Sequence, residues 1–178
     1  ANAIRASILA EKPDHIACTG DMVNIAAWRE FPPAAAWLNG LGSSEALSFT
    51  PGNHDAYVPV PWQHGLAHFV PWMQDDKRDA PPGPGMFPFL RLRRNVALLC
   101  VSTAVPQAIG KAGGTLGPQQ LARIDAELKT LGERGFFRVL MIHHPPLPGL
   151  CPPRKELTDV AALQDILKAR GCELALHG

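Results

Sequence analysis

The sequence predicts an α/β fold in one domain over residues 1–178. Short apolar runs alternate with segments whose apolar residues recur at helical spacing, the pattern of strands alternating with helices. A length of 178 residues is enough to bury one hydrophobic core. Hydrophobic residues make up 46% and charged residues 19%, as in globular proteins rather than disordered or membrane-spanning ones.

The first half of the chain contains two predicted strands and two predicted helices. Residues 1–11 have helical spacing, and an Ala-rich helix over 33–41 ends at Gly42. Apolar runs over 15–19 and 46–49 predict strands. The following segment, 56–86, is rich in proline and contains two tryptophans and two histidines. It predicts an irregular segment with one helix around 62–73.

The second half repeats the alternation. Strands over 87–92 and 96–102 are expected to form a hairpin, and Gly117-Pro118 opens an amphipathic helix. A buried strand is expected over 137–142. The last helix has Thr158 as its predicted N-cap and ends at Gly171, before a final strand over 174–176.

Charge and cysteine content narrow the possible functions. A net charge of +1 argues against a general nucleic-acid binder, which needs a strongly basic face. The four cysteines have no C-x-x-C spacing, so a zinc knuckle or redox motif is not expected. Cys18 and Cys100 lie in apolar runs, which favours a reducing, cytoplasmic setting. No stretch resembles a signal peptide or a membrane span.

Three polar clusters each follow a predicted strand directly. Because the carboxyl ends of parallel strands gather at one edge of a sheet, these clusters are expected to meet there. Carboxylate, amide oxygen and imidazole are ligands suited to Mn²⁺, Fe or Zn²⁺. The side chains concerned are Asp21, Asn53, His54, Asp55 and His143.

Each cluster also has an ordinary structural interpretation. Gly-Asp after a strand is commonly a turn, and His143-His144 before two prolines is compatible with a strand end. The occurrence of all three clusters in this order favours a shared site. His64 and His68, four residues apart, are a weaker metal pair, for which a partly exposed lid is the simpler explanation. Arg91, Arg93 and Arg94 are capable of meeting a phosphate, but a solvated hairpin tip is the default.

The order GD…GNHD…HHPP resembles the calcineurin-like metallophosphoesterase superfamily. The form HHPPLPG is most similar to the branch that contains cyclic-nucleotide and glycerophosphodiester phosphodiesterases. This resemblance implies a sandwich of two mixed β-sheets flanked by helices. It also implies metal-dependent hydrolysis of phosphate esters, most often diesters, with two divalent or trivalent ions (Mn, Fe or Zn).

The resemblance also implies roles for individual residues. Asp21 is expected to bridge the two metals, while Asn53 and His143 bind the second one. His54 is expected to donate a proton to the leaving oxygen or to stabilise the transition state, with Asp55 orienting it. His144 is expected to orient the ligands rather than bind metal itself.

Two family motifs are missing from the chain. No D-x-H precedes Gly20-Asp21, and Gly178 is only the first residue of the expected G-H-x-H. Both absences fall at a chain end, which indicates a sequence truncated at both termini. His177 precedes that glycine and is not assigned as a ligand. A polypeptide of these residues alone is therefore expected to bind metal weakly and to be nearly inactive.

The sequence leaves two alternative functions open and disfavours a third. A phosphomonoesterase of the same family and a non-catalytic scaffold on the same fold stay open. A metal-free nucleotide-binding domain is disfavoured, because the sequence has neither G-x-G-x-x-G nor G-x-x-x-x-G-K-[ST]. The expected partner is a small-molecule phosphate ester, with no nucleic acid and no membrane, and the sequence leaves the oligomeric state open.

Overall fold

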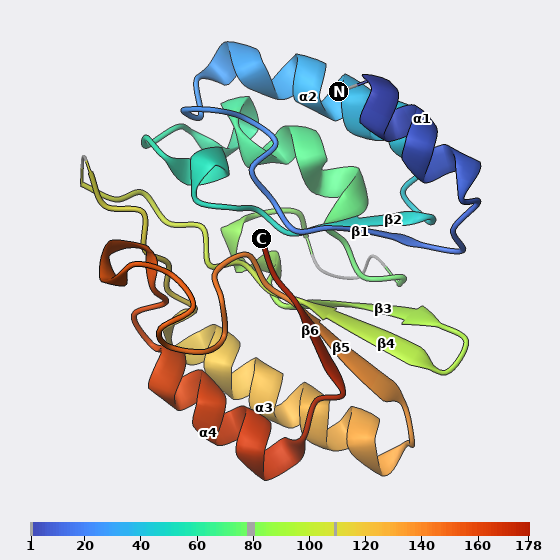
Figure 1. The fold of residues 1–178 in the computed structure, drawn as a ribbon, viewed down its shortest axis with the longest axis vertical. Coiled ribbons are helices and arrows are strands. Elements are labelled where there is room, and N and C mark those ends of the chain that lie inside the picture. The colour runs from blue at the N-terminus through green and yellow to red at the C-terminus, as the bar shows by residue number, and fades with distance from the viewer. Residues whose placement is uncertain (1, 78–80, 109) are drawn as a thin grey trace.

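A computed structural model describes residues 2–77, 81–108 and 110–178 and has a mixed α/β architecture with two sheets (Figure 1). The first sheet pairs two strands in parallel, and the second has the order β3-β4-β5-β6. In the second sheet only β3 and β4 are antiparallel. The strands are β1 (Ile16–Cys18), β2 (Leu47–Phe49), β3 (Phe89–Arg93), β4 (Val96–Cys100), β5 (Phe137–Met141) and β6 (Leu174–Leu176).

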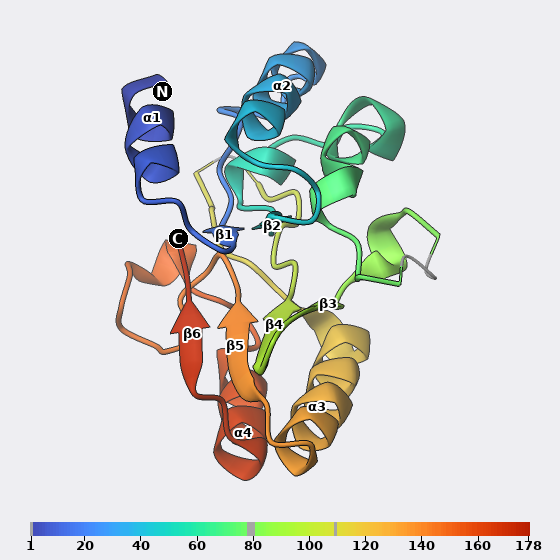
Figure 2. The same cartoon turned by 90° about the vertical axis from the view of Figure 1, so that its right-hand side faces the viewer.

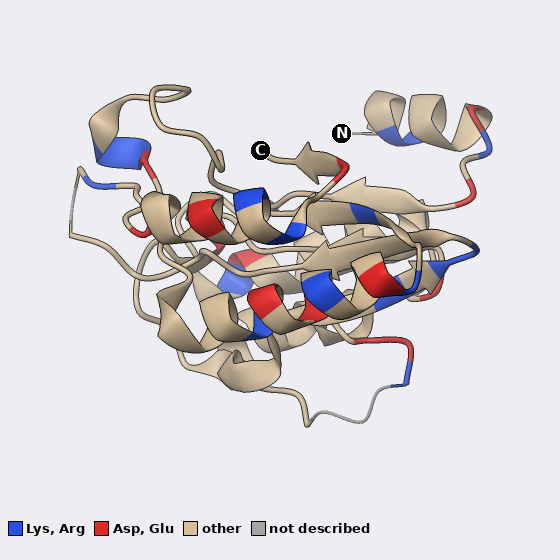
Figure 3. Cartoon of the chain, turned by 90° about the horizontal axis from the view of Figure 1, so that it is seen from below, with Lys and Arg blue, Asp and Glu red and all other residues tan. Residues whose placement is uncertain are grey.

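Helices lie outside both sheets. In Figures 1 and 2, α1 (Asn2–Ala10) and α2 (Phe31–Leu41) lie on the side of the two-stranded sheet, and α3 (Gly117–Glu133) and α4 (Val160–Arg170) lie beyond the four-stranded one. Basic and acidic residues lie close to one another along the ribbon of α3 (Figure 3). None of the helices in the described part of the chain is both long and apolar enough to cross a membrane.

The core has two parts, one on each face of the four-stranded sheet. Alternate residues of β4 point to opposite faces, as the period of a strand requires. Leu98 and Cys100 belong to the cluster that includes Phe49 of the other sheet. Leu99 and Val101 belong to the cluster formed with α3 and α4. The first cluster therefore joins the two sheets, and the second packs α3 and α4 against the four-stranded sheet.

The predicted helices and strands are confirmed, with boundaries that differ by a few residues. In the Pro-rich segment, however, the single helix expected around 62–73 is two 3₁₀ turns, Trp62–His64 and Leu66–Trp72. Pro71 lies inside the second turn and has no N–H to donate, so a regular helix is disfavoured there. The predicted sheets also differ in one respect: the two-stranded sheet is parallel, so only the four-stranded sheet is mixed.

The predicted cap of the last helix is wrong. Thr158 donates its hydroxyl to Gly114 O, 3.1 Å away, and α4 begins two residues later. Asp159 holds the N-cap position of α4, yet its carboxylate accepts the N–H groups of Leu116 and Gly117. These groups lie at the start of α3, so a residue before one helix caps another.

A polar cluster joins the two sheets ahead of β1. His15 Nε2 lies 2.9 Å from Ser48 Oγ, and Arg93 Nε donates to His15 Nδ1 over 3.2 Å. Arg93 also forms an ion pair with Asp76, and Arg91 is 1% exposed and donates to Ser44 O. The expectation that these arginines form a solvated hairpin tip is therefore wrong for Arg91 and Arg93.

The hydrogen bonds of His15 require a neutral ring. An imidazole that donates from Nε2 to Ser48 and accepts at Nδ1 from Arg93 has no place for a second proton. Burial, followed by the charges of Arg93 and Arg91, lowers the pKa of His15 to about 4. Since the pKa in the unfolded chain is about 6.5, the unfolded state binds more protons between these two values.

We therefore expect His15 to lower the free energy of unfolding as the pH decreases. Its contribution is fully present above pH 6.5 and is lost as the pH falls toward 4. Urea unfolding at pH 7.5 and pH 5.0 should show a loss about 1–2 kcal/mol larger for the wild type than for His15→Gln. The exposed His64, changed to Gln, is the matched control and should keep the wild-type loss. An equal loss in the wild type and His15→Gln would contradict this account.

Candidate functional site

The loops after β1, β2 and β5 carry the predicted site residues. These strands end at Cys18, Phe49 and Met141, and their loops emerge at the same edge of the two sheets (Figures 1 and 2). The loop after β1 turns sharply, because Gly20 has φ +108° and Asp21 has φ +59°. Left-handed backbone is unusual for a residue other than glycine and is enriched at functional sites.

Three of the predicted side chains converge at this edge. His143 Nε2 lies 3.1 Å from Asn53 Oδ1 and 3.6 Å from Asp21 Oδ1. These residues are separated by 32 and 90 positions in the sequence, so only the fold brings them together. The expected meeting of Asp21, Asn53 and His143 is therefore observed, each side chain coming from a different strand end.

The orientation of His143 is fixed by a backbone carbonyl. Its Nδ1 lies 2.7 Å from Thr19 O, which can only accept, so Nδ1 carries the proton. In the neutral ring this leaves Nε2 with a free lone pair that faces the oxygens of Asn53 and Asp21. Metal-binding histidines are commonly held by such a bond from the other ring nitrogen.

The spacing of the three donor atoms fits a shared cation. Ligands about 2.1 Å from one ion lie about 3.0–3.4 Å from each other in octahedral and tetrahedral geometry. The observed separations of 3.1 and 3.6 Å are close to that range. A nitrogen lone pair that faces two oxygen atoms is repelled by their lone pairs, and a cation among the three atoms removes this repulsion. The residues present therefore fit one metal ion.

The donor set is nevertheless small. Within the described ranges, no group of three or more His, Cys, Asp or Glu side chains gathers in a way that holds a metal. The cluster has two side chains of these types, Asp21 and His143, and the third donor is the amide of Asn53. Three donors suit a site that is completed by water, substrate or further ligands.

Glycines make the close approach of these loops possible. A Cβ on Gly52 would lie 2.2 Å from Asp21 Oδ1 and 2.7 Å from His143 Nδ1. Gly178 also lies against the site, since its N–H donates to His143 O over 3.0 Å. A Cβ at Gly178 would lie 2.7 Å from His143 Nδ1. Side chains at either position would displace the imidazole.

Asp55 joins the first two loops of the site. Its buried carboxylate accepts four backbone N–H groups at 2.8–3.1 Å. Burial raises the pKa of Asp55 to about 6, and the hydrogen bonds from these N–H groups oppose that rise by favouring the ionised form. The donors are Gly52, Asp21, Met22 and Val23.

The expectation that Asp55 orients His54 does not agree with these contacts. Both oxygens of Asp55 are bound to the backbone, and the His54 ring instead bonds through Nδ1 to Asn24 O. The ring also stacks on Tyr57, with centroids 5.7 Å apart. The His54 backbone N–H donates to Asp21 Oδ1 over 3.0 Å, so the residue adjoins the three converging side chains.

His144 supports His143 from the buried side. Its Nδ1 lies 2.6 Å from Thr103 Oγ1 and its Nε2 lies 2.9 Å from Ala112 O. Burial lowers the pKa of His144, which keeps its ring neutral. The ring packs edge-on against His143, with centroids 5.0 Å apart. Both ring nitrogens of His144 are thus bonded within the protein, and its role in orienting a ligand stays a prediction.

The weaker candidates lie elsewhere. His68 stacks on Phe31 with ring centroids 6.3 Å apart, and His64 is exposed at the end of a 3₁₀ turn. His177 is exposed next to the final glycine. The supporting groups that sequence reasoning missed are mainly the carbonyls of Thr19, Asn24 and Ala112. Backbone carbonyls are present in every residue, so no sequence signal identifies them.

Comparison with known proteins identifies no relative, since neither a family model nor a curated protein matches the chain.

We expect the four N–H bonds to Asp55 to hold the two loops together. In Asp55→Asn the new NH₂ group faces two of the four donors, so the variant should lose about 3 kcal/mol of unfolding free energy in urea. Asp165→Asn, an exposed change on α4 with the same chemistry, is the control and should stay within about 0.5 kcal/mol of wild type. Equal stabilities of the two variants would show that Asp55 does not join the loops.

Proposed function

We propose that this protein hydrolyses phosphate esters, preferably diesters, at a metal centre that contains Asp21, Asn53 and His143. The observation that carries the proposal is the approach of His143 Nε2 to Asn53 Oδ1 and Asp21 Oδ1 at 3.1 and 3.6 Å. With Nδ1 donating to Thr19 O, the neutral ring presents a lone pair to these two oxygens, an arrangement that a bound cation stabilises. The same residues lie in motifs that resemble those of calcineurin-like metallophosphoesterases, which adds support.

The proposal extends to the architecture. We infer that the two sheets are the halves of a metallophosphoesterase-type sandwich. The apolar cluster shared by both sheets, with helices beyond each, supports this assignment. In such an arrangement the parallel strands deliver their following loops to one edge, where ligands collect. We further propose a small-molecule substrate. We also propose a cytoplasmic setting, which the four free thiols support.

The proposed metal ligands and their neighbours have different roles. Asp21, Asn53 and His143 would hold one ion, and Asp21 has a second carboxylate oxygen available to share with another. When bound, two ions (Mn, Fe or Zn) supply Lewis-acid polarisation of the phosphoryl oxygens and a more acidic water. Thr19 O keeps His143 in the tautomer that leaves Nε2 free to bind.

His54 is suited to handle the proton of the leaving group. Because Nδ1 donates to Asn24 O, the basic nitrogen of the ring is Nε2. Protonated at Nε2, the ring donates that proton to the departing alkoxide oxygen, which leaves the histidine neutral. Stacking on Tyr57 and the backbone bond to Asp21 limit how far the residue moves between these states.

We expect weak but localised metal binding by these residues. Paramagnetic Mn²⁺ at millimolar concentration should broaden the NMR signals of Asn53 and His143 first, because their donor atoms contact the ion. Asp21→Asn should remove most of this broadening, since it takes away the only carboxylate of the set, and Asp165→Asn should leave it unchanged. Broadening centred on another part of the chain would reject the metal assignment.

We expect turnover to depend on His54 without metal binding depending on it. In a Mn²⁺-loaded form of the protein that also carries the D-x-H and G-H-x-H motifs, His54→Ala should lower kcat about 100-fold or more. Its Mn²⁺ content should match that of wild type. The same assay should favour bis(4-nitrophenyl) phosphate over 4-nitrophenyl phosphate.

Three results would change the proposal in distinct ways. Unchanged kcat in His54→Ala would reject the proton-donor role. A preference for 4-nitrophenyl phosphate would indicate the phosphomonoesterase alternative. Tight metal binding without turnover of either ester would favour the non-catalytic scaffold.

A further inference from the structure

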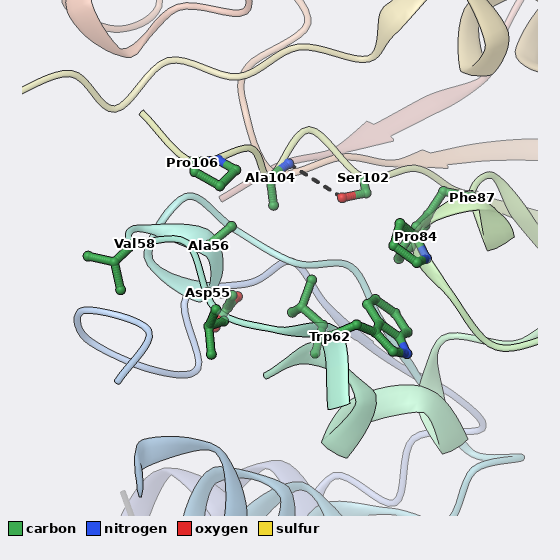
Figure 4. Close-up of a pocket in the computed structure, with 11 residues that line it drawn as sticks. Asp55, Ala56, Val58, Trp62, Pro84, Phe87, Ser102, Ala104 and Pro106 are labelled. Atoms are coloured by element: carbon green, nitrogen blue, oxygen red, sulfur yellow. Dashed lines mark hydrogen bonds between the residues drawn. The ribbon is translucent and has the colours of Figure 1, made fainter. Parts of the chain in front are cut away.

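A partly open apolar cavity of about 230 Å³ adjoins the site (Figure 4). Three segments form its walls: the residues that follow His54, the end of the Pro-rich segment, and the loop after β4. Nine of the eleven lining residues are apolar, and the other two are Asp55 and Ser102. The apolar residues are Ala56, Val58, Val60, Trp62, Leu66, Pro84, Phe87, Ala104 and Pro106.

The cavity shares one residue, Asp55, with the loops of the candidate metal centre. Asp55 lines it, and the carboxylate of Asp55 accepts the N–H groups of Asp21 and Gly52 at 2.8 Å. On the opposite wall, Ala104 directly follows Thr103, whose hydroxyl bonds the His144 ring. The cavity is therefore bounded by Asp55, which is hydrogen-bonded to the backbone of Asp21, and by the residue that follows the Thr103 partner of His144.

We propose that this cavity binds the apolar alcohol group of the phosphate ester, an aryl or a branched alkyl group about the size of one ring. The inference rests on the proposed function, because the phosphate of such an ester would lie at Asp21, Asn53 and His143. A cavity of about 150 Å³ is enough to hold benzene, so this one accommodates a substituted ring.

The lining chemistry selects against polyol esters. Asp55 has both carboxylate oxygens bound to backbone N–H groups, so it offers little to a sugar or glycerol hydroxyl. Ser102 Oγ accepts from Ala104 N over 3.4 Å and keeps one O–H to donate. A polyol would leave most of its hydroxyls without partners among nine apolar residues. One hydrogen bond and an apolar wall match an aryl ester group whose ring carries one further polar substituent, as the 4-nitrophenyl group does.

The test measures binding of 4-nitrophenol by NMR, with glycerol as the polar comparison. We expect 4-nitrophenol to shift the Trp62 indole N–H and Ala104 amide signals at millimolar concentration, and glycerol to shift neither. Ala104→Leu fills the cavity and should weaken binding about tenfold or more. Ala162→Leu, the same change at an exposed position of α4, should bind as wild type does.

A second variant keeps the test informative if Ala104→Leu misfolds. Val58 lines the cavity at a position that is 41% exposed, so Val58→Phe adds a ring to its wall without repacking the core. It should weaken 4-nitrophenol binding in the same direction. Shifts centred elsewhere, equal shifts with glycerol, or wild-type affinity in both Val58→Phe and Ala104→Leu would overturn the inference.

The two proposals fail separately. Binding of 4-nitrophenol needs neither metal nor turnover. Localised binding, together with no ester hydrolysis by the Mn²⁺-loaded form that carries the D-x-H and G-H-x-H motifs, would reject the proposed function and leave an apolar ligand site. Hydrolysis of esters without localised binding would reject the cavity as the alcohol subsite. In an active form, Ala104→Leu should lower kcat/KM for a 4-nitrophenyl ester about tenfold relative to a glycerol ester.

Discussion

The site depends above all on one carboxylate. Asp55 accepts backbone N–H groups from the loop after β1 and from the loop after β2, at distances of 2.8–3.1 Å. The two-stranded sheet contributes only three residue pairs, too few to fix the loops beyond it. Because buried N–H groups are costly to leave unpaired, the carboxylate holds the left-handed turn at Gly20-Asp21 in place. The positions of Asp21 and Asn53 follow from that turn.

Around this connection, the site uses backbone more than side chains. Thr19 O sets the tautomer of His143, Asn24 O does the same for His54, and Ala112 O fixes one nitrogen of His144. Thr19 directly follows β1, so the strand places its carbonyl, whereas Asn24 and Ala112 lie in loops. Backbone carbonyls thereby orient three imidazoles, while the carboxylate of Asp55 accepts four backbone N–H groups instead of a histidine.

The helices and strands, and the meeting of Asp21, Asn53 and His143, could be predicted from the sequence. Apolar periodicity and placement at strand ends are local signals. Prediction failed where one residue serves a distant segment. Thr158 and Asp159 stabilise the region before α3 rather than their own helix, and Arg91 is buried against Ser44 O. The partner of Asp55 was mistaken for the same reason. A side chain that bonds backbone more than 30 residues away leaves no pattern in its own neighbourhood.

The proposed metal ligands and the cavity are formed by different parts of the chain, which indicates where substrate specificity arises. The three converging donors follow short buried strands, so their geometry is fixed by the core that joins the two sheets. The cavity beside them is formed largely by Pro-rich and irregular chain, whose φ angles proline restricts without sheet or helix bonds. Substitutions in that segment change the shape and polarity of the cavity while the strands keep Asp21, Asn53 and His143 in register. Affinity for a metal and choice of an ester group are therefore separable properties of this fold, the first set by strand ends and the second by the segment after His54.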